Sequence, residues 1–161
     1  MKKILVFLVA VIACCTVSQA QQGQSAVGVY LNYGNETNVG LGLKYRYSFN
    51  DNWRIEPAFD YYFKHDYVSF WDLGANVHYV FHPTEVVHIY PLAGLHYASA
   101  TAHMKDVGLG DNVTDGKFGI NLGAGVDFKV AAALTVGIEA KYQIVNDFNQ
   151  LVVSAGITYC F

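Results

Sequence analysis

Residues 118–128 read FGINLGAGVDF, and residues 134–144 read LTVGIEAKYQI. In each segment, bulky apolar side chains alternate with small or polar ones over eleven residues. A period of two is typical of a β-strand and not of a helix. Such a run is longer than the roughly five or six residues of an average soluble strand, and it matches the ~9–11 residues that a tilted strand needs to cross a bilayer. The two segments therefore predict membrane-spanning strands.

Six further segments of the chain show the same alternation. They lie near residues 25–33, 38–49, 53–64, 69–81, 86–100 and 150–161. Pro57 and Pro91 fall inside two of them, where proline removes a backbone donor from the ladder. Because a closed barrel has no free edge to accommodate a proline, we expect a local bulge at each position.

The connections between these eight segments fall into two sets. Short turns lie at residues 50–52, 82–85 and 129–133. The other connections lie at residues 34–38, 65–68, 104–116 and 146–150. In a barrel with an even number of antiparallel strands, the short turns and both termini face the periplasm and the longer loops face outward. The sequence therefore predicts an all-β fold, an eight-stranded antiparallel up-and-down transmembrane β-barrel.

The composition agrees with an integral membrane protein. Hydrophobic residues make up 53% of the chain and charged residues 14%, where about 25% charged is usual. Beyond residue 20 no apolar run is long enough for a transmembrane helix. Hydrocarbon offers no partner to unpaired backbone groups, so such a chain can span a membrane only as a closed barrel.

The N-terminal residues have the features of an export signal. Lys2 and Lys3 precede an apolar run at residues 4–13, and residues 18–20 (SQA) fit the rule for cleavage before Gln21. We therefore predict a signal peptide over residues 1–20 and a barrel domain over residues 21–161. The alternative is a lipobox at residues 11–14, in which Cys14 would be lipidated.

Two features of the polar face predict that it points into the barrel. Most glycines share this face with the charges, and the interior of an eight-stranded barrel is only wide enough for its own side chains. Positive and negative charges are also nearly balanced, which suits an enclosed network of ion pairs. The alternative is a soluble carrier barrel with its apolar face inside. The predicted interior charges are Lys44, Arg46, Arg54, Glu56, Asp60, Asp72, Asp127, Glu139 and Lys141, together with Lys64 and Lys117.

Aromatic residues gather at the strand ends that we assign to the periplasm. Rings at the membrane–water interface form a girdle in outer-membrane barrels. The predicted girdle consists of Tyr45, Tyr47, Trp53, Tyr79, Phe81 and Phe128.

The last five residues, ITYCF, place Phe161 two positions after Tyr159 on an alternating strand. This ending resembles the signal by which the outer-membrane assembly machinery recognises its substrates, which makes Tyr159 and Phe161 the implied assembly signal. Together with the export signal, the eight strands and residues 89–94 (IYPLAG), it makes the mature chain similar to the small OmpA/OmpX-type outer-membrane barrel family. A peptidoglycan-binding domain like that of OmpA is not implied, because the chain stops at Phe161.

The resemblance implies several partners and a general role. It implies a place in the outer membrane, contact with its lipid and lipopolysaccharide, and assembly as a monomer by the barrel assembly machinery. It also implies a role in envelope stability or surface interaction, with a surface ligand that the sequence does not name. We expect no nucleic-acid partner.

No pattern in the sequence indicates an enzyme, a cofactor or a metal centre. His78, His88 and His96 point inward in the predicted register but lack a metal-ligand spacing, so we expect them to form interior hydrogen bonds. One alternative is a narrow pore for small solutes, although eight strands leave no room for a continuous channel. The other is a lipid-modifying enzyme, which needs a nucleophile beside a base at the outer rim. The rim candidates for that chemistry are His65, Asp66, Ser69, Ser99 and His103.

Acidic residues dominate the outward connections. They are Glu36, Asp66, Asp106, Asp111, Asp115 and Asp147, against Lys105. Divalent cations could bridge this rim to anionic lipopolysaccharide, or salt could screen it over a Debye length of ~8 Å. The sequence leaves both open.

Overall fold

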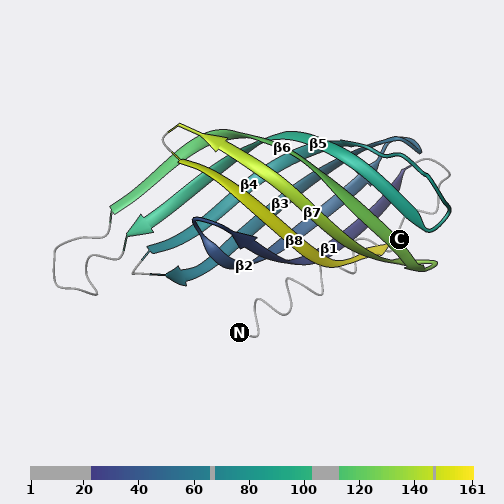
Figure 1. The fold of residues 1–161 in the computed structure, drawn as a ribbon, viewed down its shortest axis with the longest axis horizontal. Helices are drawn as coiled ribbons and strands as arrows, with labels where there is room; N and C mark the ends of the chain where they lie inside the picture. Colours follow the sequence, from purple (N-terminus) through teal and green to yellow (C-terminus); the bar gives the residue numbers. More distant parts are fainter. Residues whose placement is uncertain (1–22, 66–67, 103–112, 147) are drawn as a thin grey trace.

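The computed structural model describes residues 23–65, 68–102, 113–146 and 148–161. Their strands are β1 (Gln24–Gly34), β2 (Asn38–Ser48), β3 (Trp53–His65), β4 (Val68–Tyr79), β5 (Val87–Ala102), β6 (Val113–Ala131), β7 (Leu134–Val145) and β8 (Phe148–Cys160). Each strand pairs with the next, and the series closes on itself as a barrel (Figure 1). This confirms the predicted eight-stranded antiparallel architecture. Within these ranges, no helix has the length and apolar character needed to cross a membrane. The predicted signal peptide lies outside the described residues.

The barrel closes through antiparallel pairing of its first and last strands. Ala26 lies opposite Cys160 at one end of this ladder, and Gly34 lies opposite Val152 at the other. Just beyond the ladder, the backbone N–H of Phe161 donates to the carbonyl oxygen of Ser25 at 2.9 Å. Closure therefore removes the free edges that β1 and β8 would otherwise expose.

Pro57 and Pro91 do not cause the bulges that the sequence predicted. Pro57 stays in register opposite Ala75 of β4, and the β2–β3 pairing is interrupted around it without a shift. The β4–β5 ladder ends at Leu92, immediately after Pro91. Each proline, which lacks a backbone N–H, therefore lies where the pairing with one neighbouring strand is interrupted or has ended. The barrel wall needs no bulge residue to accommodate it.

The hairpin of β5 and β6 extends beyond the neighbouring β7 at the end of the barrel away from Cys160 (Figure 1). The β5–β6 ladder continues to the pair Ala102↔Val113, whereas β7 pairs with β6 only as far as Gly119↔Val145. The predicted loop over residues 104–116 is therefore wrong for residues 113–116, which belong to β6. These residues lack apolar alternation because a strand that has left the lipid no longer needs an apolar face.

The two faces of the barrel wall have opposite chemistry. Large apolar side chains such as Leu43, Leu122 and Ile138 point outward and are exposed. Charged side chains on the other face are buried, with 1% of Lys44 and 0% of Glu139 exposed. A soluble carrier barrel would have the reverse arrangement, so the apolar face is the one that meets lipid.

The six residues of the predicted girdle lie toward the end where β1 begins and β8 ends. The ring of Tyr79 meets those of Trp53 and Phe81 edge to face, each at a centroid distance of 4.9 Å. Tyr45 and Phe128 are exposed, and Tyr47 is half-buried. This placement suits rings that sit at a membrane–water interface.

A second line of rings crosses β3 to β6 nearer the other end, and the sequence did not predict it. Phe59 lies 6.3 Å from Trp71, Trp71 lies 5.7 Å from Tyr97, and Tyr97 lies 4.9 Å from Phe118, measured between ring centroids. On these four strands the line lies farther from Gln24 and Cys160 than the predicted girdle does, which suits rings nearer the second membrane–water interface.

Glycines make room for large rings inside the barrel. Tyr30, Tyr62 and Tyr90 point inward and are fully buried. A Cβ atom on Gly156 would lie 2.6 Å from the ring of Tyr30, and one on Gly125 would lie 2.4 Å from the ring of Tyr90. The narrow interior can therefore hold these rings only where the residue opposite each ring, on the paired strand, is a glycine.

At Gly123 the close neighbour is backbone, which predicts a large penalty for any side chain. A Cβ atom there would lie 2.3 Å from the carbonyl oxygen of Ala140 and 2.7 Å from Cα of Lys141. We expect Gly123→Ala to destabilise the barrel by about 1–3 kcal/mol through overpacking. Ala124→Val adds volume at the next, lipid-facing position and should change stability by less than about 0.5 kcal/mol. Urea unfolding in lipid vesicles measures both, and equal midpoints would contradict the prediction.

Candidate functional site

All nine main interior charges lie buried inside the barrel. They expose between 0% and 8% of their surface, and they are Lys44, Arg46, Arg54, Glu56, Asp60, Asp72, Asp127, Glu139 and Lys141. Lys117 was predicted to join them, but 40% of its side chain is exposed, and its Nζ donates to the carbonyl oxygen of Asn146 at 3.3 Å. The interior prediction is wrong for Lys117 because β6 has passed the rim of the barrel at that point. The side chain of Lys64 lies outside the described set.

Lys44 of β2 lies between carboxylates from two other strands. Its Nζ is 2.6 Å from Oε1 of Glu139 on β7 and 3.3 Å from Oε1 of Glu56 on β3. Arg46, two residues along β2, donates from Nε to Oε2 of Glu56 at 2.5 Å. Buried charges require close partners of this kind to offset the loss of hydration. The contacts tie β2, β3 and β7 together across the interior.

Asp127 of β6 extends this network to a second arginine. Its Oδ2 accepts from Nη1 of Arg46 at 3.1 Å and from Nη2 of Arg54 at 2.8 Å. The guanidinium of Arg54 also lies 4.2 Å from the ring centroid of Tyr90, and the hydroxyl of Tyr90 donates to Oε2 of Glu139 at 3.1 Å. The sequence analysis missed Tyr90 as part of the site. The available signal was a bulky ring on the face that otherwise carries glycine and charge.

A second network fills the other half of the barrel, toward the connections that the sequence predicts to face outward. Nζ of Lys141 lies 2.8 Å from Oδ2 of Asp60. Asp72 contacts Nδ1 of His96 and accepts from Nε2 of Gln143 at 3.2 Å. In a medium of low dielectric, such connected networks stabilise one arrangement of the interior over others.

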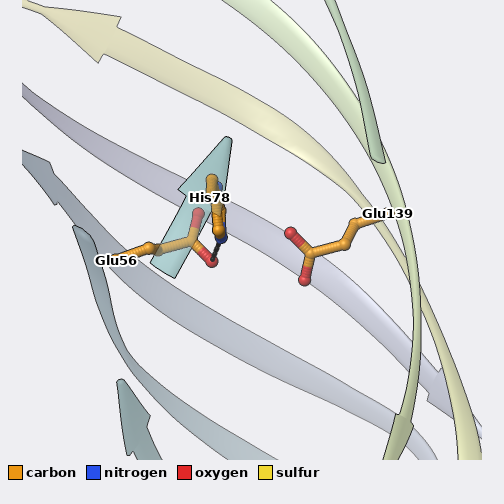
Figure 2. Close-up of side chains that lie close together, drawn as sticks. All are labelled: Glu56, His78 and Glu139. Atoms are coloured by element: carbon orange, nitrogen blue, oxygen red, sulfur yellow. Dashed lines mark ion pairs between the residues drawn. The ribbon is translucent and has the colours of Figure 1, made fainter. Parts of the chain in front are cut away.

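Glu56, His78 and Glu139 form a candidate metal centre in the described part of the chain, with one ligand atom from each within 4.8 Å of the others (Figure 2). Two contacts make it unsuitable for a metal ion. The Lys44 ammonium already lies between the two carboxylates. Nδ1 of His78 accepts from Nε of Arg54 at 2.9 Å, so the neutral ring carries its proton on Nε2, the atom nearest Glu56. The cluster is a cation site whose cation is the lysine ammonium.

The residues that the enzyme alternative requires do not form a site among those described. Asp66, His103 and the side chain of His65 lie outside the described set, Ser69 is half-buried, and Ser99 is buried. Besides Glu56–His78, the described residues contain the acid–histidine pair Asp72–His96, and the additional group at Nδ1 of His96 is the amide of Gln143, at 3.1 Å. An amide is not a nucleophile, so this pair lacks the partner that covalent catalysis needs.

A cavity of about 970 Å³ opens at the end of the barrel where β1 begins and β8 ends. We call it the periplasmic vestibule, because the sequence predicts that this end of the barrel faces the periplasm. Arg46, Arg54 and Asp127 line it where it meets the interior network, and His82 and His88 line it nearer the mouth. The buried ion pairs therefore close the vestibule toward the middle of the barrel.

Tyr159 and Phe161 lie on the outward face beside this mouth. They expose 57% and 40% of their surface, and their rings stack at a centroid distance of 6.4 Å. Exposure of both rings is compatible with recognition by another protein. Their role as an assembly signal stays a prediction.

Comparison with known proteins places the chain among outer-membrane barrels. The family model for the outer membrane protein beta-barrel domain matches residues 7–161. A search of curated protein sequences finds no significant match. The N-terminal β-barrel domain of Pseudomonas aeruginosa OprF superposes with a TM-score of 0.73 at 16% identity, covering 87% of this chain and 98% of that one.

Two further solved structures share the fold. Ail, the attachment invasion locus protein of Yersinia pestis, has a TM-score of 0.64 at 22% identity, covering 88% of this chain and 100% of its own. Neisserial surface protein A has a TM-score of 0.65 at 17% identity, covering 89% and 100%. Because the family model spans nearly the whole sequence, this chain belongs to the outer membrane protein beta-barrel domain family.

Proposed function

We propose that this outer-membrane protein is a non-enzymatic platform that presents the β5–β6 hairpin for interaction at the cell surface. The observation that carries the proposal is the extension of β6 past the end of β7. An extension of this kind has no role in closing the barrel. It does offer a strand edge to an extended segment of another protein, a common mode of peptide recognition.

The direction of the backbone groups along β6 supports this proposal. The N–H of Lys129 donates to the carbonyl oxygen of Val86, on the β5 side, at 2.8 Å. Backbone groups alternate along a strand, and the β5–β6 register has no shift, so Thr114 and Gly116 direct theirs away from β5. In the ranges that the structure covers, the β7 ladder starts only at Gly119. A partner strand could therefore pair with β6 at these two positions.

The interior networks support a platform in preference to a pore. Lys44, Arg46 and Arg54 bind carboxylates from β3, β6 and β7, and these contacts cross the lumen where a solute would have to pass. An eight-stranded barrel is already too narrow for a continuous aqueous channel. The same contacts join the strands of the wall to one another across the interior.

The comparison with Ail raises a second kind of surface ligand. Ail was solved with the heparin analogue sucrose octasulfate, which is a polyanion. The charged residues at the predicted outward end of this chain are mostly acidic, including Glu36 in a connection and Asp115 near the start of β6, and like charges repel a polyanion. We therefore favour an extended protein segment as ligand. We further propose that the barrel functions as a monomer, contacts lipopolysaccharide and is inserted by the barrel assembly machinery, for which Tyr159 and Phe161 provide the recognition signal.

Attachment of bacteria to cultured epithelial monolayers tests the platform proposal. Cells carrying Thr114→Pro, which removes the outward-directed N–H, should attach several-fold less than wild type and match a deletion strain. Cells carrying Thr114→Val keep that N–H and should attach like wild type, at equal outer-membrane levels of all variants.

Two further measurements test the alternatives. Sucrose octasulfate should not reduce the attachment of wild-type cells, and the protein in planar bilayers should show no single-channel conductance. Equal attachment of the deletion strain and wild type would contradict the platform, and steady conductance would favour the pore.

A further inference from the structure

Two histidines lie together in the periplasmic vestibule, far from the projecting hairpin. His82 is in the turn after β4 and is exposed, and His88 is in β5 and is half-buried. Their ring centroids are 4.5 Å apart, and the ring planes meet at 66°. Both side chains line the vestibule, so both imidazoles are reached from the periplasm.

The bonding of these two rings differs from that of the interior histidines. Nδ1 of His78 accepts from Arg54, and Nδ1 of His96 contacts Asp72. His82 and His88 contact each other by their rings, and among the described residues no side-chain hydrogen bond or ion pair engages their nitrogens. Imidazole nitrogen is a ligand that suits borderline transition-metal ions, and these two rings lie in contact with each other and open to solvent.

The surrounding charges decide which kind of cation the pair suits. Asp127 lies opposite His88 in the β5–β6 ladder, but its carboxylate binds Arg46 and Arg54. Lys129 and Asp51 also line the vestibule, and their charges offset each other. Calcium and magnesium require several oxygen ligands, which the pair does not supply. A nitrogen-preferring ion needs no carboxylate, and Cu²⁺ stands highest in the order of divalent affinities.

Binding of one ion by both rings requires a rotation of one imidazole. An ion bound by imidazole lies about 2.0–2.1 Å from the ligating nitrogen of each ring. His82 is exposed in a turn, so rotation of its side chain can turn a nitrogen toward that of His88 without disturbing the barrel wall. The cavity of about 970 Å³ leaves space for water molecules to complete the coordination sphere.

We propose that His82 and His88 form a two-imidazole site for a divalent transition-metal ion, with Cu²⁺ the preferred ion and Zn²⁺ a weaker one. The ion enters from the periplasmic side. The site is independent of the surface interaction proposed above, because it lies at the opposite end of the barrel and shares no residue with the edge of β6.

Titration of tag-free protein in detergent micelles with Cu²⁺ tests the site. Calorimetry should detect one equivalent bound per chain, and the electron paramagnetic resonance spectrum should show hyperfine coupling to two imidazole nitrogens. Loss of an outer-shell partner alone lowers metal affinity about 10–100-fold, so His82→Asn and His88→Asn should each lower it at least tenfold. Zn²⁺ should compete with Cu²⁺ for the same equivalent.

Thr135→Val is the matched control, because Thr135 lines the same vestibule and carries no ligand for Cu²⁺. It should bind Cu²⁺ like wild type. Heat-modifiable migration on gels verifies that each variant is folded, and both histidines lie at the rim, where substitution should not disturb the interior. Wild-type affinity in the variant that lacks both histidines, a spectrum with fewer than two nitrogens, or no binding at all would each overturn the proposal.

Discussion

Glu56→Leu is expected to destabilise the barrel by about 3–5 kcal/mol, the usual penalty for removing one partner of a buried ion pair. Glu56 is fully buried and accepts from Arg46 at 2.5 Å while lying 3.3 Å from Nζ of Lys44. The leucine would leave both cations with one carboxylate fewer in a medium that cannot hydrate them. Urea unfolding in lipid vesicles, followed by tryptophan fluorescence, measures the loss.

Two companion variants separate charge from packing. Glu85→Leu makes the same change in an exposed turn and should alter stability by less than about 0.5 kcal/mol. Glu56→Leu combined with Lys44→Met removes both partners and should recover part of the loss, because an apolar pair can replace a buried ion pair at little net penalty. A loss below about 1 kcal/mol for Glu56→Leu alone would show that water reaches the interior network and screens it.

Leu122→Arg is expected to destabilise the folded barrel by about 2–4 kcal/mol, as a cation does at the mid-plane of a bilayer. Leu122 lies in the middle of β6, opposite Ala93 of β5 and Tyr142 of β7, and exposes 48% of its surface. That exposed surface is the one that meets hydrocarbon. Reversible folding into vesicles gives the change in free energy.

The matched control places the same charge in water. Val86 is also exposed, at 53%, but lies in the turn before β5. Val86→Arg should therefore change stability by no more than about 1 kcal/mol, the value found near an interface. Equal effects at the two positions would mean that the lipid belt lies elsewhere on the wall.

The sequence predicted the strands well wherever lipid touches them, because the bilayer imposes apolar alternation. It failed at residues 113–116, where β6 continues into water and that constraint ends. It also failed at Pro57 and Pro91, since a strand pattern does not reveal where the pairing with a neighbouring strand is interrupted or ends. Only the pairing of neighbouring strands carries that information.

For the interior, the pattern identified which residues point inward but not their partners. Lys44 and Glu139 were both placed on the inner face, yet their contact depends on the stagger between β2 and β7, which alternation does not report. The role of Tyr90 was missed for a related reason, because its ring fits only above Gly125 on the facing strand. The ring pair of His82 and His88 likewise depends on how the turn before β5 folds back.

The closing ladder between β1 and β8 has a consequence for how this chain folds. The other ladders join strands that are neighbours in sequence, whereas this one joins Ala26 to Cys160, nearly the full length of the domain. The entropy of bringing two ends together rises with the length of the intervening chain, and contacts of large sequence separation slow folding. Until β8 arrives, β1 carries an unpaired edge that can pair with other chains. Closure should therefore limit the folding rate, and substitutions that weaken the β1–β8 ladder should slow insertion more than equally destabilising ones in β3 or β4.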